Sequence, residues 1–341
     1  MIIMRIAVLL EGLDNKNLHK AFKAKNDEFY TRYEDIEKEI KYYKEQFRNK
    51  VVFCNCDNPN WSNFFFYFLE NFNELGLKKL ISSGLNSEKI EITRIDRISR
   101  REVLKLMRSL KKDLTKDKKA IKFKNKSIEL ILSKESNYSF SSQESISSLI
   151  ESDIVVTNPP FSLFREFINL LFEFEKDFLI IGSNLASSLK DLFPKIKEGT
   201  VSIGMTSPDI FISPEGEEKR VRTYWYSTLK SSEEKPFLEL TDTYNKRDYP
   251  EYRNFKAINV DSIRRIPKDY YGIQGVPINF LWKYNPRQFK LIGILAKSLV
   301  SEKLKKRYYT DNKKIKVSQG IIRVNGEDKN LFTRVLIKRR R

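Results

Sequence analysis

Apolar residues along the chain fall into short continuous runs and into stretches of helical spacing, and the two kinds alternate. Short apolar runs of four to six residues are typical of strands buried inside a sheet. The runs that predict such strands lie at 51–54, 77–82, 153–157, 178–182, 201–205 and 224–229. The alternation predicts an α/β fold.

The stretches of helical spacing lie beside these predicted strands. A Thr31–Glu34 capping box precedes the first one, and Gly76 is a plausible C-cap for the second. The apolar residues on the helical faces are Ile36, Ile40, Tyr43 and Phe47, then Phe65, Phe68, Leu69, Phe72 and Leu75, and finally Phe164, Phe167, Ile168, Leu171 and Phe174. Strand, helix and strand between 51 and 82 form a βαβ unit, which predicts a parallel sheet.

Beyond about residue 230 this regular pattern gives way to sequence rich in Pro, Tyr and Asn. A hairpin is expected between 320–324 and 333–337. Its loop around Asn325-Gly326 would be longer than the tight two-residue form.

Composition restricts the chemistry that the chain can perform. Its one histidine, His19, lies in a poorly patterned stretch, so we expect no histidine-dependent catalysis and no metal site. Cys54 and Cys56 are too close for a relaxed disulfide, which fits a reducing compartment. The opening residues 1–10 lack the features of a signal peptide, and no apolar run is long enough to span a bilayer. We therefore expect a cytoplasmic protein that is not bound to a membrane.

The net charge of +19 in 341 residues points to a polyanionic partner, and it is unevenly distributed. Residues 88–134 carry +9 and residues 303–341 carry +11, so the rest of the chain is close to neutral. The distribution predicts a nearly neutral body with two basic attachments that contact the phosphates of a nucleic acid. The phosphate-binding residues that we select are Lys111, Lys112, Arg339 and Arg340. For 88–134 the alternative is a helix with ordinary surface lysines.

The segment Asn158-Pro159-Pro160-Phe161 carries the clearest chemistry, because it follows a predicted buried strand. Two prolines supply no backbone N–H, so their carbonyls stay available as acceptors. The Asn158 side-chain oxygen and the Pro159 carbonyl could each accept one N–H of an adenine amine, and Phe161 could stack on the base. The base would have to leave the duplex to reach them. Alternatively, the segment is a simple strand-ending turn with a core phenylalanine.

The segment 153–167 resembles the core of amino-group DNA methyltransferases and, more narrowly, the EcoRI-type adenine-specific DNA methyltransferase family. The resemblance runs from about residue 22 to the C-terminus, interrupted by a basic insertion at 88–134. The other blocks that resemble this family, in the same order, are 26–31, 52–66, 75–81, 178–182, 275–281, 283–286 and 334–337.

The resemblance implies an S-adenosylmethionine-dependent enzyme that makes N6-methyladenine in double-stranded DNA. Such enzymes often serve restriction–modification systems, so a cognate restriction endonuclease is an expected partner. The implied fold is a Rossmann-like methyltransferase sheet with helices on both faces. Three parts are expected: an N-terminal extension at 1–25, a methyltransferase domain at 26–229 that includes the insertion, and a target-recognition region at 230–341.

The resemblance also implies the site residues. Asn158, Pro159, Pro160 and Phe161 would form the target-adenine pocket, and the start of the helix after the first strand would offer backbone amides to the cofactor carboxylate. The residues implied to bind the cofactor are Phe29, Tyr30, Thr31, Asp57, Asn58, Pro59, Ser62, Ser139 and Phe140.

Three positions depart from the family pattern. Asn58 and Ser139 stand where an acidic residue is expected, and Trp282 replaces a polar or acidic one. These departures leave open the alternative that the chain is a catalytically weak DNA-binding protein of the same fold. A further alternative is methylation of RNA or of a protein glutamine, although the basic stretches argue against a small protein acceptor.

Overall fold

The structure, a computed structural model, describes residues 30–86, 89–96, 99, 101–103, 105, 128–132, 140, 142–213, 216–295 and 320–341. It divides into two compact units. The first comprises Met1–Ser183 and Thr206–Ser231, and the second comprises Asn184–Met205 and Ser232–Arg341. The assignment of 26–229 as a methyltransferase domain and of 230–341 as a target-recognition region stays a prediction. The predicted N-terminal extension and His19 lie outside the described residues.

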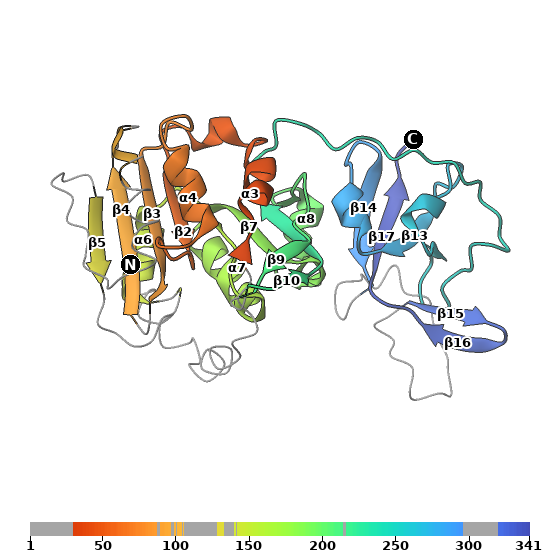
Figure 1. The fold of residues 1–341 in the computed structure, drawn as a ribbon. Coiled ribbons are helices and arrows are strands. Elements are labelled where there is room, and N and C mark those ends of the chain that lie inside the picture. Colours follow the sequence, from red (N-terminus) through yellow and green to blue (C-terminus); the bar gives the residue numbers. More distant parts are fainter. Residues whose placement is uncertain are drawn as a thin grey trace. The chain divides into compact units, whose positions relative to one another are not determined.

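The first unit is built on a mixed sheet (Figure 1), whose strands lie in the order β5-β4-β3-β2-β6-β7-β11. Their bounds are β5 Ile128–Leu132, β4 Lys89–Asp96, β3 Lys79–Asn86, β2 Val51–Asn55, β6 Ile154–Thr157, β7 Asp177–Ser183 and β11 Thr223–Ser227. β2 runs parallel to β3 and β6, and β6 runs parallel to β7. The predicted βαβ unit is therefore confirmed. The sheet is mixed rather than wholly parallel, because β4, β5 and β11 run antiparallel to their neighbours.

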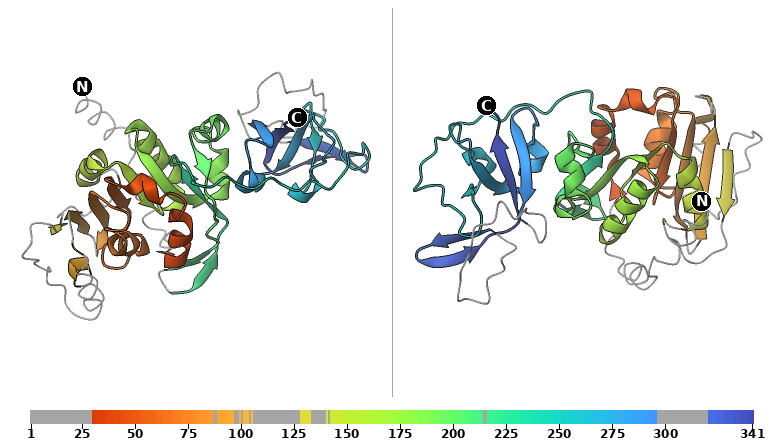
Figure 2. Two further views of the ribbon diagram at one scale, coloured as in Figure 1. Left: turned by 90° about the horizontal axis from the view of Figure 1, so that it is seen from above. Right: turned by 180° about the vertical axis from the view of Figure 1, so that it is seen from behind.

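Helices cover both faces of this sheet (Figure 2). On one face, α3 (Tyr33–Ile40) and α4 (Asn63–Glu70) pack against alternate strand residues such as Val52, Cys54 and Val156. On the other face lie α6 (Gln143–Glu151) and α7 (Phe164–Glu173). Gly182 of β7 allows this close packing, since a Cβ there would lie 2.2 Å from the Phe164 ring. Burial on both faces explains why these strands read as continuous apolar runs.

The predicted helix that begins at a Thr31–Glu34 capping box is shorter than expected. Thr31 lies in a strand, β1 (Tyr30–Thr31), and Arg32 precedes α3 without a side-chain cap. A 3-10 turn, η1 (Lys44–Phe47), follows α3. The predicted apolar face is nevertheless buried. The capping prediction is wrong because Thr31 pairs with Phe211 and is held in extended conformation.

The second predicted helix also ends early, because α4 stops at Glu70. Phe72 and Leu75 are buried in the turn that follows it. Gly76 closes that turn with φ +62°, a conformation that favours glycine.

The last two strands at one side of the sheet fall within the predicted basic insertion. β4 and β5 pair with each other, and β4 pairs with β3, so parts of 88–134 extend the sheet. Most of the chain between these strands, with Lys111 and Lys112, lies outside the described residues.

The first unit also holds a small antiparallel sheet in the order β1-β9-β10. β9 spans Ile210–Ile212 and β10 spans Glu218–Arg220. The pairing of β1 with β9 fixes the start of the described chain beside Phe211.

The second unit has a four-stranded sheet in the order β12-β13-β17-β14. The bounds are β12 Ile258–Asn259, β13 Ile273–Pro277, β17 Arg334–Arg339 and β14 Phe289–Ile294. The other elements of this unit are η3 Asn184–Ser188, α8 Phe193–Glu198, β8 Ser202–Ile203, η4 Ile263–Arg265 and α9 Phe280–Lys283.

The predicted C-terminal hairpin is wrong in its partner strand. β15 (Ile321–Val324) pairs with β16 (Glu327–Asn330) through a tight turn in which Asn325 and Gly326 both have positive φ. β17 instead joins β13 and β14. The polar sequence of β16 hides it from a search for apolar runs, whereas Asn-Gly is the typical signal of a two-residue turn.

In the described part of the chain, no helix is long and apolar enough to cross a membrane.

Candidate active site

The candidate site lies at the carboxyl ends of the adjacent parallel strands β2 and β6. After β2 the chain leads to α4 on one face of the sheet, and after β6 it leads to α7 on the other. Ligands of open α/β sheets bind at such switch points. The predicted residues 57–62 and 158–161 follow these two strands directly, and the structure brings them together.

The carboxylate of Asp57 joins the two segments. Ser62 Oγ donates to Asp57 Oδ1 at 2.6 Å, and Thr157 Oγ1 donates to Asp57 Oδ2 at 2.6 Å. Asp57 is only 6% exposed. Its side chain therefore braces the end of β6, one residue before Asn158, instead of facing a ligand.

Burial dominates the ionisation of Asp57. It raises the pKa of this carboxyl to about 7, although the hydrogen bonds from Ser62 and Thr157 act in the opposite direction. The folded chain therefore holds a proton on this carboxyl more tightly than a water-exposed chain does.

The turn after β2 is also anchored to the neighbouring strand β3. Asp57 N donates to the Ser83 carbonyl at 2.7 Å, and Ser82 Oγ donates to the Asp57 carbonyl. Gly84 lies directly against the turn, since a Cβ at this position would meet Asn58 N at 2.4 Å. The backbone of Asp57 and Asn58 is therefore held in one place.

Within the turn, Asn58 and Ser62 shape the start of α4. Asn58 Oδ1 accepts from Asn60 N at 2.9 Å, a role that an aspartate oxygen could equally fill. Ser62 caps the helix and accepts from Phe64 N and Phe65 N. These two amides, expected to face the cofactor carboxylate, thus already have an acceptor.

Tyr30 and Thr31 lie beside this turn. Asn63 Nδ2 donates to the Thr31 carbonyl at 2.8 Å, and the rings of Tyr30 and Trp61 are 4.6 Å apart. Thr31 Oγ1 is buried and has no hydrogen-bond partner among the described residues. Trp61 is 39% exposed, so this corner of the site faces solvent.

The segment after β6 leads into a short 3-10 helix, η2 (Phe161–Leu163). Leu163 N donates to the Pro160 carbonyl at 3.0 Å, whereas no donor in the described chain reaches the Pro159 carbonyl. Phe161 is half-buried and meets Phe211 edge to face at 6.2 Å. Because Phe211 pairs with Thr31, the β1–β9 ladder connects the two halves of the site.

Other predicted residues are not brought to this cluster by the contacts described. Phe140 is 3% exposed and packs against Phe167 in the core. Arg339 and Arg340 belong to the second unit, as does Trp282, whose ring lies 4.0 Å from Lys283 Nζ. The remaining predicted residues, Phe29, Ser139, Lys111 and Lys112, lie outside the described residues.

The sequence prediction missed three residues that shape the site. Thr157 bridges to Asp57, Trp61 stands against Tyr30, and Gly84 supports Asn58. Only Thr157 had a local signal, as a hydroxyl residue at the end of an apolar strand next to Asn158.

Comparisons with known proteins agree with this architecture. The family model described as "Adenine-specific methyltransferase EcoRI" matches residues 17–340. The type II methyltransferase M.EcoRI of Escherichia coli is 42% identical over 299 residues, which cover 82% of this chain and 89% of that protein. The type II methyltransferases M.MgeORF184P of Mycoplasma genitalium and M.MpnI of Mycoplasma pneumoniae are each 35% identical, over 95% and 94% of this chain and 98% of their own lengths. No solved structure matches the chain.

Proposed function

The chain belongs to the EcoRI family of adenine-specific methyltransferases, and on that premise we propose how its residues carry out the reaction. It is an adenine-specific DNA methyltransferase, the modification enzyme of a restriction–modification system. The single observation that supports the assignment of its site is the junction of Asp57 with Thr157. It joins the turn after β2 to the Asn158–Phe161 segment at the switch point of the sheet.

The Asn158–Phe161 segment is the proposed pocket for an adenine turned out of the duplex. The Asn158 side-chain oxygen and the Pro159 carbonyl accept the two N–H groups of the N6 amine. This supports the geometry in which the nitrogen lone pair points toward the methyl donor. Phe161 stacks on the base, and its contact with Phe211 holds the ring in place. After methyl transfer the amine nitrogen loses one proton to solvent.

S-adenosylmethionine is the proposed cofactor, and when bound it supplies an electrophilic methyl group on sulfonium. The residues beside the β2 turn fit such a group. Thr31 Oγ1 is a buried oxygen that lacks a partner in the described chain, and Tyr30 and Trp61 offer aromatic faces beside it. The turn beside these three residues is shaped by Asn58, Pro59 and Ser62. Asp57 stabilises it by accepting a hydrogen bond from Ser62. We also propose that the large mixed sheet of the first unit is the Rossmann-like sheet of methyltransferases.

Replacement of Gly84 by alanine tests this cofactor assignment. The new Cβ would overlap the backbone of Asn58, so the turn must shift, at a cost of roughly 1–3 kcal/mol. We expect cofactor affinity, measured by calorimetry, to fall severalfold. Gly199→Ala is the control. No heavy atom lies within 4 Å of the Cβ there, so only its positive φ is strained. Equal cofactor affinities in the two variants would count against the assignment.

The reaction itself is tested with labelled cofactor and unmethylated DNA. After digestion of the DNA to nucleosides, the label is expected in N6-methyladenine. RNA and protein acceptors, offered in competition, separate the alternatives that share this fold. A folded protein that binds the cofactor yet leaves adenine in DNA unlabelled would contradict the proposed reaction.

The substrate is proposed to be double-stranded DNA, with residues 230–341 as the target-recognition region. The second unit, which contains Ser232–Arg341, has its own sheet. Its last strand, β17, ends at Arg339 and is followed by Arg340, and these two arginines are the proposed phosphate contacts. A restriction endonuclease with the same target sequence is the proposed partner in the cell.

A further inference from the structure

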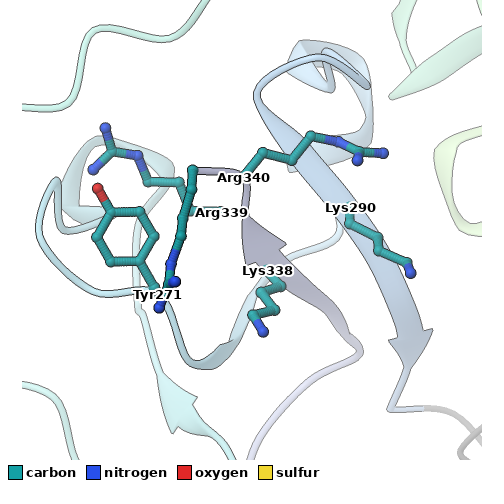
Figure 3. Close-up of a pocket in the computed structure, with 6 residues that line it drawn as sticks. Tyr271, Lys290, Lys338, Arg339 and Arg340 are labelled. Atoms are coloured by element: carbon teal, nitrogen blue, oxygen red, sulfur yellow. The ribbon is translucent and has the colours of Figure 1, made fainter.

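A hollow lined almost wholly by basic side chains lies at one end of the second unit's sheet (Figure 3). We call it the cationic pocket. Its volume is about 480 Å³. It is lined by Tyr271, Lys290, Lys338, Arg339, Arg340 and Arg341. The strands β14 and β17 and the chain end after β17 supply the five basic residues, and no acidic side chain is among the six lining residues.

Two of these cations are placed where they repel each other. Lys290 of β14 and Lys338 of β17 are direct partners in the antiparallel ladder, so their side chains stand on the same face of the sheet. Like charges directly opposite each other destabilise a strand pair. Among the described residues, neither lysine has a carboxylate partner. An anion placed between the two ammonium groups would attract both of them and offset their mutual repulsion.

Several arginines of the unit outside this pocket are paired with carboxylates. Arg253 pairs with Asp328 at 2.6 Å, and Arg287 pairs with Glu234 at 3.1 Å. By contrast, Arg339 and Arg341 have no carboxylate partner in the described chain. Together with Lys290 and Lys338, these two arginines leave the cationic pocket with positive charge that no described carboxylate neutralises.

Tyr271 orders the pocket. Its ring centre lies 5.1 Å from Cζ of Arg339 and 5.9 Å from Cζ of Arg341, both within the range of cation–π attraction. Arg340 is held separately, because its Nε donates to the Pro286 carbonyl at 2.6 Å. Guanidinium groups held in this way present planar donor sets that suit phosphate oxygens. The pocket is open and multiply charged, which suits a chain of phosphates better than a single small anion.

We propose that the cationic pocket binds the sugar–phosphate backbone of the substrate DNA. This inference rests on the proposed function and adds Tyr271, Lys290, Lys338 and Arg341 to the two arginines expected from the sequence. The pocket contacts phosphates, so it positions the duplex without reading its sequence.

The test compares two double variants of the full chain that lose the same charge. Lys290→Gln/Lys338→Gln removes the opposed pair from the pocket, and Lys246→Gln/Lys256→Gln removes two exposed lysines of the same unit outside it. Affinity for two short fluorescent DNA duplexes of unrelated sequence is measured by anisotropy at several salt concentrations.

The pocket variant is expected to bind both duplexes at least tenfold more weakly than the wild type. The slope of log affinity against log salt should become shallower by about 0.9 for each phosphate that the variant no longer neutralises. The control pair should change both quantities much less. Tyr271→Leu, which keeps every cation, should weaken binding to both duplexes by a smaller factor.

Several results would overturn the proposal. One is equal binding by the pocket variant and the control, and another is a weakening confined to one of the two duplexes. Tight binding of inorganic phosphate by the wild type, abolished in the pocket variant without any change in DNA affinity, would assign the pocket to a free anion. Weakened binding of duplex RNA with unchanged binding of duplex DNA would also contradict it. Methylation of adenine by the wild type is scored separately, so failure of this inference is distinguishable from failure of the proposed function.

Discussion

Replacing Asn158 by alanine is expected to lower the rate of methyl transfer by roughly 100- to 1,000-fold while the chain stays folded. The variant loses the side-chain oxygen that we propose accepts one N–H of the target amine, so the nitrogen would no longer be held against the methyl donor. Asn158 is half-buried after the end of β6 and belongs to no helix or strand. Its removal should therefore change the free energy of unfolding by only about 1 kcal/mol.

The measurement is the single-turnover rate at saturating DNA and cofactor, with thermal unfolding in parallel. Asn73→Ala is the matched control, because Asn73 is an exposed asparagine of the same unit, away from the strand ends. Transfer by Asn158→Ala at the control's rate would exclude this residue from the reaction. A fall in rate that merely follows a loss of folding would contradict the expectation that the variant stays folded.

Replacing Asp57 by alanine is expected to damage both stability and catalysis. The hydroxyls of Ser62 and Thr157 lose their shared acceptor inside the protein, which should cost roughly 2 kcal/mol or more in unfolding free energy. Thr157 immediately precedes Asn158, so a shift of the strand end would displace the proposed target-base pocket. A displacement of about 1 Å can lower a rate by about 100-fold. Chemical denaturation and single-turnover kinetics measure the two effects.

The isosteric variant Asp57→Asn keeps the shape of the side chain but cannot ionise. The unfolding free energies of wild type and variant, compared across pH, therefore report the effect of the charge. Burial raises the pKa of Asp57 from 3.8 to about 7, so the folded chain holds this proton more tightly than the unfolded chain. The resulting stabilisation is complete below about pH 4 and is lost as pH rises through about 7. Between these values the stability of wild type relative to Asp57→Asn should fall by about 1.4 kcal/mol per pH unit. A difference that does not vary with pH would contradict the raised pKa of Asp57.

Much of the first unit was predictable because its strands are buried on both faces. Runs such as 51–54 and 178–182 have no polar positions, and they form β2 and β7 as expected. The exact ends of the helices were harder to predict from the sequence. Thr31 has the residue type of a cap, yet a strand pair with Phe211, far away in sequence, determines its conformation. β16 escaped prediction because all four of its residues are polar or charged.

In the candidate site, too, some features could be predicted from neighbouring residues and others depend on residues far apart in sequence. Asn158, Pro159 and Phe161 are close together in sequence, and their neighbouring apolar strand already predicted a turn at a sheet edge. The role of Asp57 as a brace could not be read from its own neighbours, because its partner Thr157 lies 100 residues away. The cationic pocket also combines distant segments, and its opposed lysines become visible only in the register of β14 and β17.

The hydroxyl of Thr157 has one proton but lies within reach of two acceptors, the Asn55 carbonyl and Asp57 Oδ2. When Asp57 is ionised, the hydroxyl donates to the carboxylate. When Asp57 holds a proton, the carboxyl can itself donate to Thr157, and the hydroxyl then turns to the Asn55 carbonyl. Burial raises the pKa of Asp57, which moves the change between the two arrangements toward neutral pH. The residue before Asn158 thus has two hydrogen-bonding arrangements that differ in the protonation of Asp57.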